Sequence, residues 1–228
     1  DLIAQVMDKD VAIQINTVEF PYLSHNIRIS GGATINDVRN TAPNPSISIN
    51  AFTLDIDDSI TNASGKISRE AISLNIETEG FPLSILTQDI APASFVTKNA
   101  PGLTFNTLNA KGTITGRPSN PSFDGQIETY FSYLDTAYEA LLIGSIAKDG
   151  LNINELDISH KDGFLKSSGT LNFASRIMDI KLNAENIDLA IGKPFLPKQL
   201  DKLSGKVKSV RGTINGSPSN PNIDIKNY

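Results

Sequence analysis

The sequence predicts an all-β fold of antiparallel strands, and three observations carry this prediction. Isoleucine is heavily used, with 28 residues among 228, and it stands beside many Asn, Ser, Thr and Gly residues. This composition is typical of strands and turns. Apolar and polar residues alternate along several short segments, as they do in half-buried strands. One part of the chain also recurs about 100 residues later, which indicates a repeated β unit.

The repeat is clearest at two 13-residue segments. Residues 112–124 read GTITGRPSNPSFD and residues 212–224 read GTINGSPSNPNID, with nine of the thirteen positions identical. Upstream, residues 46–67 align without gaps onto 150–171, and residues 72–86 align onto 178–192. We therefore expect two units, 1–121 with a truncated start and 122–221, followed at 222–228 by the start of a further strand. We expect them to form one continuous groove rather than independent domains.

The parity of the apolar positions changes at equivalent places in the two copies. Ile72, Leu74 and Ile76 alternate with polar residues, but the apolar positions are odd-numbered after Gly80. In the second copy the same change falls at Asn186. An inserted residue, a β-bulge, changes the parity in this way while it keeps the apolar face on one side. Both residues tolerate positive φ, and we expect them to set the curvature of a strongly curved sheet.

A second change of parity lies between Ile49 and Phe52 and recurs between Ile153 and Leu156. Helices are expected only as short turns in loops, over residues 83–89 and 197–202. Proline cannot donate to a central ladder, so each proline of the G-x-P-x-x-P segments marks the end of a strand. These prolines are Pro118, Pro121, Pro218 and Pro221.

Composition and charge exclude several classes of function. The net charge is −5, which argues against nucleic acid as the main partner. There is no cysteine, so disulfides and thiolate metal sites are excluded. A membrane-spanning helix needs about 20 apolar residues, and the longest apolar stretch, around residues 140–147, is far shorter. The start at Asp1 and the strand-like end NIDIKNY indicate a piece of a longer protein.

The sequence offers little for catalysis or for metal binding. Asp55, Asp57 and Asp58 form the tightest acidic cluster, but a calcium loop that begins at Asp55 would need Gly at its sixth position and Glu at its twelfth. Those positions hold Ile60 and Lys66. The two histidines have no cysteine partner and no nearby acid–serine grouping. We expect a solvated strand end at the acidic cluster, and no metal, cofactor or enzymatic activity.

One stretch of the chain is locally basic, and two interpretations of it stay open. It could contact lipid headgroups or an acidic partner, or it could be a solvated face with lysines that guard a sheet edge. The stretch comprises Lys193, Lys198, Lys202, Lys206, Lys208 and Arg211.

The apolar stripe of the strands is the main candidate site. It could be the core of a closed β-sandwich. Aromatic residues are only 7% of the chain, however, which is thin for filling a sandwich. An unfilled sheet with one apolar face would leave an exposed groove, and such a surface indicates binding. The residues expected to line it are Ile47, Ile49, Phe52, Leu54, Ile72, Leu74, Ile76, Phe81, Leu83, Ile85, Leu151, Ile153, Leu156, Ile158, Ile180, Leu182, Ile187, Leu189 and Ile191.

Two segments of the chain resemble a known family. Residues 82–127 (PLSILTQDIAPASFVTKNAPGLTFNTLNAKGTITGRPSNPSFDGQI) and residues 188–225 resemble the repeats of TamB and the wider AsmA-like proteins of diderm bacteria. The resemblance covers most of residues 46–228, and it is carried by the order of the motifs rather than by any one of them. It implies an elongated half-pipe of antiparallel strands, a "β-taco", with an apolar interior that is open along one side.

The resemblance also implies a function, a location and partners. Such proteins are implicated in carrying phospholipids between the inner and outer membranes, and are similar in principle to the bridge-like lipid transfer proteins. The implied location is the periplasm, with the parent chain anchored in the inner membrane. An Omp85-type outer-membrane protein is an implied partner of the parent chain, through a link to outer-membrane assembly. No catalytic residue carries over.

Two other classes of function stay in view. One is a structural or adhesive β-repeat rod with a filled core and a protein partner. The other is an enzyme that acts on envelope polysaccharide, which would need paired carboxylates facing one cleft. The strand-end aspartates do not suggest such a pair.

Overall fold

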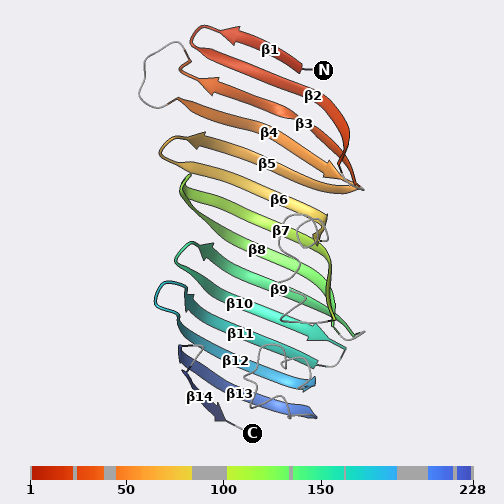
Figure 1. Cartoon of the computed structure of the whole chain (residues 1–228), viewed down its shortest axis with the longest axis vertical. Coiled ribbons are helices and arrows are strands. Elements are labelled where there is room, and N and C mark those ends of the chain that lie inside the picture. The colour runs from red at the N-terminus through yellow and green to blue at the C-terminus, as the bar shows by residue number, and fades with distance from the viewer. Residues whose placement is uncertain are drawn as a thin grey trace. The chain divides into compact units, whose positions relative to one another are not determined.

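The computed structural model describes residues 2–22, 25–38, 45–83, 102–133, 136–161, 163–188, 205–217 and 220–226. Almost all of the regular structure in these residues is β-strand, which confirms the predicted class. The described strands form one open antiparallel sheet, in which fourteen strands follow one another in chain order (Figure 1). Each strand therefore lies beside the strands that precede and follow it in the sequence.

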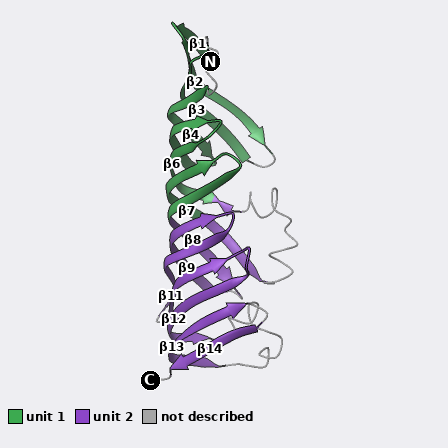
Figure 2. Cartoon of the chain, turned by 90° about the vertical axis from the view of Figure 1, so that its left-hand side faces the viewer, with its two compact units in different colours: residues 1–81, 108–125 green, residues 82–107, 126–228 purple. Residues whose placement is uncertain are grey.

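The chain divides into two compact units (Figure 2). Unit 1 contains residues 1–81 and 108–125, and unit 2 contains residues 82–107 and 126–228. Strands β7 (Leu103–Arg117) and β8 (Asn120–Tyr133) are each divided between the units. The division into repeats at residues 121 and 221 rests on sequence similarity and stays a prediction.

The remaining strands fall wholly or almost wholly within one unit. Unit 1 contains β1 (Leu2–Met7), β2 (Asp10–Tyr22), β3 (His25–Asn36), β4 (Ser46–Ile56), β5 (Ser59–Ser68) and β6 (Ile72–Pro82), the last of which ends one residue beyond the boundary. Unit 2 contains β9 (Thr136–Ala147), β10 (Gly150–His160), β11 (Gly163–Asn172), β12 (Ile177–Asp188), β13 (Lys206–Ser217) and β14 (Asn220–Lys226).

Tight turns join several of these strands. Asp57 and Asp58 connect β4 to β5 with φ values of 49° and 72°. Positive φ at both central residues is the geometry of a type I′ turn, whose twist matches that of the two strands it connects. Aspartate tolerates this conformation because its short polar side chain hydrogen-bonds locally. The acidic cluster is therefore a hairpin turn at the end of a strand, as expected.

Both predicted changes of parity near the middle of a strand are β-bulges. The register between β4 and β5 shifts between Ile49 and Phe52, and the register between β10 and β11 shifts between Ile153 and Leu156. The apolar side chains before and after each shift stay on the same face. This explains why the sequence alternation skips one position.

A third bulge was not foreseen. The register between β2 and β3 shifts between Ile15 and Val18. The same skipped position is visible in the sequence, because Ile13 and Ile15 are odd-numbered whereas Val18 and Phe20 are even-numbered. The first 45 residues match the repeat only weakly, which is why the similarity between the copies did not reveal it.

Gly80 and Asn186 have φ values of 66° and 50°, the positive values that the change of parity indicates. Pairing between β12 and β13 continues past Asn186 without a shift, from Glu185 opposite Ser209 to Ile187 opposite Val207. The positive φ of Asn186 is therefore accommodated without a register shift between β12 and β13. Its role in setting curvature stays a prediction.

The two similar 13-residue segments form corresponding hairpins. The first spans the end of β7 and the start of β8, and the second spans the end of β13 and the start of β14. A Cβ added at Gly112 would lie 2.4 Å from the Asp124 carbonyl oxygen, and one at Gly212 would lie 2.5 Å from that of Asp224. Glycine is thus needed at this position of both segments for the same reason, because the neighbouring strand approaches too closely for a side chain.

Of the two short helical turns, only Leu83 falls in the described chain, where it is helical; residues 84–89 and 197–202 lie outside it. No helix within the described ranges has the length and apolar character needed to span a membrane. Pro118 lies in the turn after β7, while Pro121 and Pro221 are the second residues of β8 and β14. Pro218 lies outside the described residues.

Candidate functional site

The register of unit 1 places the predicted apolar side chains on one face of the sheet. Residues directly opposite each other in an antiparallel pair point to the same side. Across β4, β5 and β6, Phe52 lies opposite Ala63, which lies opposite Ile76. Two further rows run in parallel, from Ile49 through Gly65 to Leu74, and from Ile47 through Ile67 to Ile72. Leu54 shares this face through Thr61.

Unit 2 builds the same kind of face. Leu151 of β10 lies opposite Leu171 of β11, which lies opposite Met178 of β12. The parallel rows pass from Ile153 through Gly169 to Ile180, and from Leu156 through Ser167 to Leu182. Ile158 joins the face through Leu165.

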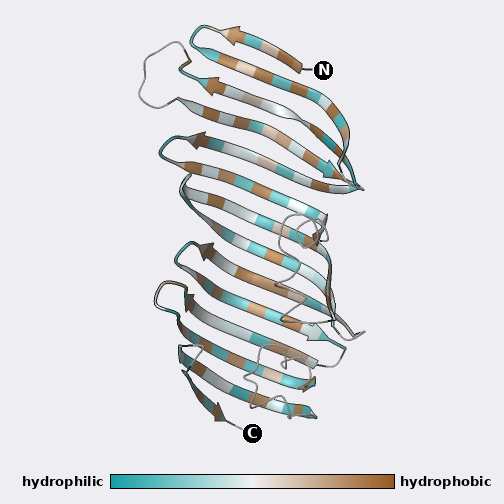
Figure 3. Cartoon of the chain, in the orientation of Figure 1, coloured by the Kyte–Doolittle hydropathy of each residue, from teal (hydrophilic) through white to brown (hydrophobic). Residues whose placement is uncertain are grey.

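The other face of the same strands is mostly polar, with Ile60 and Phe164 as exceptions. In β6 the residues between the apolar positions are Ser73, Asn75 and Glu77, all of which are exposed. In β12 they include Asp179 and Lys181, which are also exposed. The hydropathy colouring shows this change from residue to residue along the strands (Figure 3). We name the two sides the apolar face and the polar face.

The apolar face is only partly covered. Most of the predicted lining residues that the structure describes are of intermediate exposure. Ile47 is 40% exposed, and of the described ones only Leu83 and Ile153 are buried. Among the described residues no large side chain is completely buried. A filled sandwich core would enclose such side chains.

The remaining residues of the predicted lining are not placed on the apolar face by the rows of opposite residues given above. Phe81 and Leu83 follow Gly80, and Leu83 is 9% exposed. Ile187 lies opposite Val207, just after Asn186. Ile85, Leu189 and Ile191 lie outside the described residues.

The sequence reasoning missed much of the apolar face. In unit 1 the face continues through β3 and β2, where Ile29 lies opposite Val18 and Ile35 opposite Val11. In unit 2 it continues into β9 and β13, where Leu142 lies opposite Leu156 and Ile214 opposite Ile180. Period-two alternation in these segments was the signal that could have found them.

Aromatic rings cross part of unit 2 in a row. The centroids of Phe105 and Phe131 are 6.0 Å apart, and those of Phe131 and Tyr138 are 5.2 Å apart. The His160 ring lies 4.9 Å from that of Tyr138. Burial raises the pKa of the Tyr138 hydroxyl, because a phenolate would be poorly solvated there. These contacts account for His160, whose Nδ1 also lies 2.7 Å from the Ala137 carbonyl oxygen.

The other histidine has an acidic partner that the sequence analysis did not find. His25 Nδ1 lies 2.5 Å from Asp57 Oδ2, and the Asn26 backbone N–H donates to Asp57 Oδ1 at 2.8 Å. Arg28 Nη1 lies 3.4 Å from Asp55 Oδ2. The acidic cluster is thus used in contacts between strands, and the described residues contain no group of acids and histidines that could hold a metal ion.

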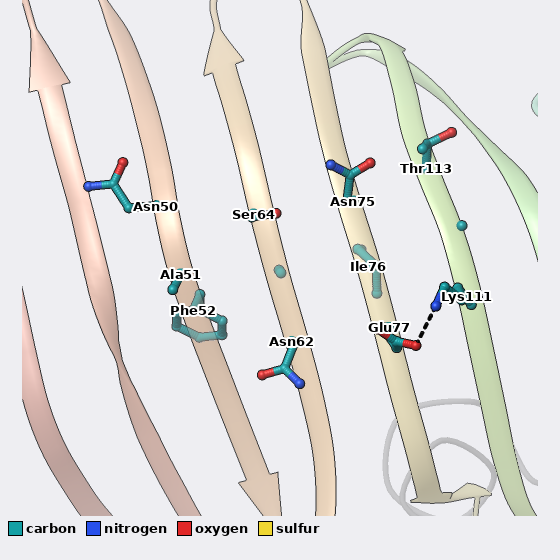
Figure 4. Close-up of a pocket in the computed structure, with 12 residues that line it drawn as sticks. Asn50, Ala51, Phe52, Asn62, Ser64, Asn75, Ile76, Glu77, Lys111 and Thr113 are labelled. Carbon is teal, nitrogen blue, oxygen red and sulfur yellow. Dashed lines mark hydrogen bonds and ion pairs between the residues drawn. The ribbon is translucent and has the colours of Figure 1, made fainter.

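A cleft of about 570 Å³ is present in unit 1, and Phe52 and Ile76 of the predicted lining are among the residues around it. Figure 4 shows Asn62, Asn75 and Glu77 on the near side of the ribbon, whereas Phe52 and Ile76 lie behind it. Lys111 Nζ lies 2.8 Å from Glu77 Oε1, and this pair raises the pKa of the lysine. The cleft opens on the side of Asn62, Asn75 and Glu77, and its lining combines their hydrogen-bonding groups with apolar atoms.

The basic stretch is only partly within the described chain. Lys206, Lys208 and Arg211 lie on β13 and are exposed. Lys193, Lys198 and Lys202 lie outside the described residues.

Comparisons with protein-family models, with curated proteins and with solved structures gave no match for this chain. The candidate site therefore rests on the register and the exposure of its own residues.

Proposed function

We propose that this chain is a segment of a lipid conduit in the envelope of a diderm bacterium. In this proposal its apolar face carries phospholipid acyl chains between the inner and outer membranes, while the headgroups stay in water. The proposal includes a sheet that curves into a half-pipe, a location in the periplasm, and a parent chain that is anchored in the inner membrane. It also includes the link to outer-membrane assembly through an Omp85-type protein. These elements come from the resemblance to TamB and the AsmA-like proteins.

One observation supports the proposal above all others. In β4 to β6 and in β10 to β12 the predicted apolar side chains that the register places share one face of each unit, and that face is partly exposed. A partly exposed apolar face that spans several neighbouring strands is unusual on a soluble protein without a binding role. Acyl chains are suitable occupants, because they need an apolar path and no specific hydrogen bonds. No bond is made or broken in such transfer, so no catalytic group is required.

The bulges contribute to this mechanism. A bulge inserts one residue and then restores the direction of the following side chains. Without the shift between Ile153 and Leu156, the second half of β10 would turn its apolar residues to the polar face. The bulges therefore keep the apolar face continuous over the length of each bulged strand, which widens the apolar surface that an acyl chain can contact.

The test is site-specific photocrosslinking in cells, with the probe at Ile180 in one variant and at Lys181 in another. These neighbours point to opposite faces, since Ile180 lies opposite Gly169 and Lys181 opposite Ser168. The proposal predicts captured phospholipid at position 180 and none at 181. Equal capture at both positions, or capture at neither in a folded protein, would contradict it. The second result would favour a rod with a filled core and a protein partner.

A further inference from the structure

A row of polar and basic side chains crosses the polar face of unit 2. Lys166 of β11 lies opposite Asn183 of β12, Asn183 lies opposite Arg211 of β13, and Arg211 lies opposite Lys226 of β14. Lys166, Arg211 and Lys226 are exposed. The row contrasts with the chain as a whole, whose net charge is −5.

Two like charges face each other directly in this row. Arg211 and Lys226 are a cross-strand pair, and like charges in that position destabilise a sheet. Lys166 differs, because its Nζ lies 2.7 Å from Asp157 Oδ2. Within the described residues, neither Arg211 nor Lys226 forms an ion pair. No direct ion pair within the described chain therefore offsets the repulsion between them.

The immediate neighbours of Arg211 on the polar face can all donate hydrogen bonds. They are Asn183 and Lys226 on the adjoining strands, and Ser209 and Thr213 two residues away on β13. Thr213 Oγ1 accepts from Asn215 Nδ2 at 3.5 Å, so its own hydroxyl proton stays available.

Charged residues lie at the positions diagonal to Arg211, that is, two residues along the strand from its direct cross-strand partners. Glu185 and Asp224 are two residues from its direct partners, Asn183 and Lys226. Lys181 is also on a diagonal, since it lies opposite Thr213. The positions directly beside Arg211 are thus free of carboxylates, while Glu185, Asp224 and the exposed cation Lys181 occupy diagonal positions that a long side chain can reach.

We propose that this cluster of donors, the Arg211 site, binds a phosphate ester. A guanidinium group binds phosphate oxygens in a bidentate manner, and a lysine ammonium adds a point charge. A bound phosphate placed between Arg211 and Lys226 would convert their mutual repulsion into two attractive contacts. The surrounding hydroxyl and amide groups would hold the remaining oxygens. The site lies on the face opposite to the predicted lipid path, so it does not depend on the proposed function.

The first experiment titrates the protein with inorganic phosphate at low ionic strength, with chloride at matched ionic strength as the reference. Backbone amide shifts should move at Asn183, Ser209, Arg211 and Lys226. Arg211→Gln should weaken binding about tenfold, because it removes the bidentate charged donor. The matched control is Lys66→Gln in unit 1, since Lys66 lies between Ser48 and Ser73 with no second cation opposite. This control should leave phosphate binding unchanged.

Thermal unfolding gives a second, independent signature. Without phosphate, Arg211→Gln should raise the melting temperature, because it removes one of two opposed like charges. With phosphate, the unaltered protein should gain more stability than the variant does at the same phosphate concentration. A purely structural role for Arg211 would give the opposite sign in the first measurement.

Two sources could supply the phosphate ester, and vesicles distinguish them. Sedimentation with phosphatidylglycerol in phosphatidylcholine vesicles, displaced by free phosphate and absent with phosphatidylcholine alone, would identify a lipid headgroup. Binding of phosphate without binding to vesicles would identify a soluble phosphate ester. The proposal is overturned if phosphate moves none of these amides, or if Arg211→Gln binds it as well as the unaltered protein does. Lipid capture at Ile180 is unaffected by either result.

Discussion

His25 and Asp57 are 32 residues apart in the sequence, and their contact joins the start of β3 to the turn after β4. The Asn26 N–H donates to the same carboxylate, and together with His25 it lowers the pKa of Asp57 below its usual value of 3.8. Hydrogen bonds to the charged form of a carboxyl group favour that form. The turn is therefore stabilised by an ionised Asp57.

The first prediction concerns this carboxylate. Since the folded-state pKa of Asp57 lies below 3.8, its contribution to stability is complete above the unfolded pKa and is lost as the pH falls through the folded value. Asp57→Asn should therefore lower the melting temperature near neutral pH, and the difference from the unaltered protein should shrink below about pH 4. Thermal unfolding measured at a series of pH values tests this. Asp58→Asn, in the same turn, is the control, and a pH-independent difference for Asp57→Asn would contradict the assignment.

At the scale of the strands, each of the three bulges faces a glycine with an unusual backbone. Gly31 lies opposite Ile15, Gly65 opposite Ile49 and Gly169 opposite Ile153, with φ values of 145°, 135° and 143°. A Cβ added at Gly169 would lie 2.0 Å from the Asp179 carbonyl oxygen. Glycine is required there for both reasons, the backbone conformation and the close approach of the next strand.

The second prediction follows from this arrangement. Gly169→Ala should lower the free energy of unfolding by about 3 kcal/mol, because a strained φ and a steric overlap act together. Gly32→Ala is the control, since its φ is not in the positive range and its Cβ would meet chiefly the movable end of Gln14. Urea unfolding monitored by circular dichroism measures both. A loss at Gly169 no larger than the loss at Gly32 would mean that the backbone relaxes around the added methyl group.

The alternation of apolar and polar residues made the strands and two of the bulges predictable. Features that depend on contacts between strands could not be predicted in this way. The skipped position between Ile49 and Phe52 is a property of the sequence itself, so the bulge could be located without coordinates. The glycine opposite each bulge was not recognised, because its role depends on the register with the next strand. The contact between His25 and Asp57 was missed for the same reason, since nothing local in the sequence brings β3 and the β4–β5 turn together.

For the molecule as a whole, the nature of the apolar face decides between a conduit and a filled core. The third prediction uses Leu182, which lies between Ser167 and Gly212 on the neighbouring strands. These small residues leave space for a longer side chain. Leu182→Arg should lower the free energy of unfolding by about 1 kcal/mol or less, as a substitution at an accessible position does. It should nevertheless abolish lipid capture at Ile180, because it places a charge in the path of the acyl chains.

A filled core predicts a different result, because an unpaired buried charge is strongly destabilising. Thermal unfolding and photocrosslinking of the same variant separate the two cases. Asp179→Arg, which adds the same side chain to the polar face of β12, is the matched control. A Leu182→Arg protein that unfolds, or one that folds and still captures lipid at Ile180, would count against the conduit.

The strictly sequential order of the strands has a consequence for how such a chain changes over evolutionary time. Every strand in the described part of the chain pairs only with its neighbours in the sequence, so duplicating or deleting one hairpin leaves all other pairings in place. Two added strands also restore the original direction of the chain. The apolar face and the polar face then continue unchanged from the existing strands to the added ones. A sheet of this kind can gain or lose one hairpin at a time without a change of fold. The length of the sheet can therefore change readily during evolution.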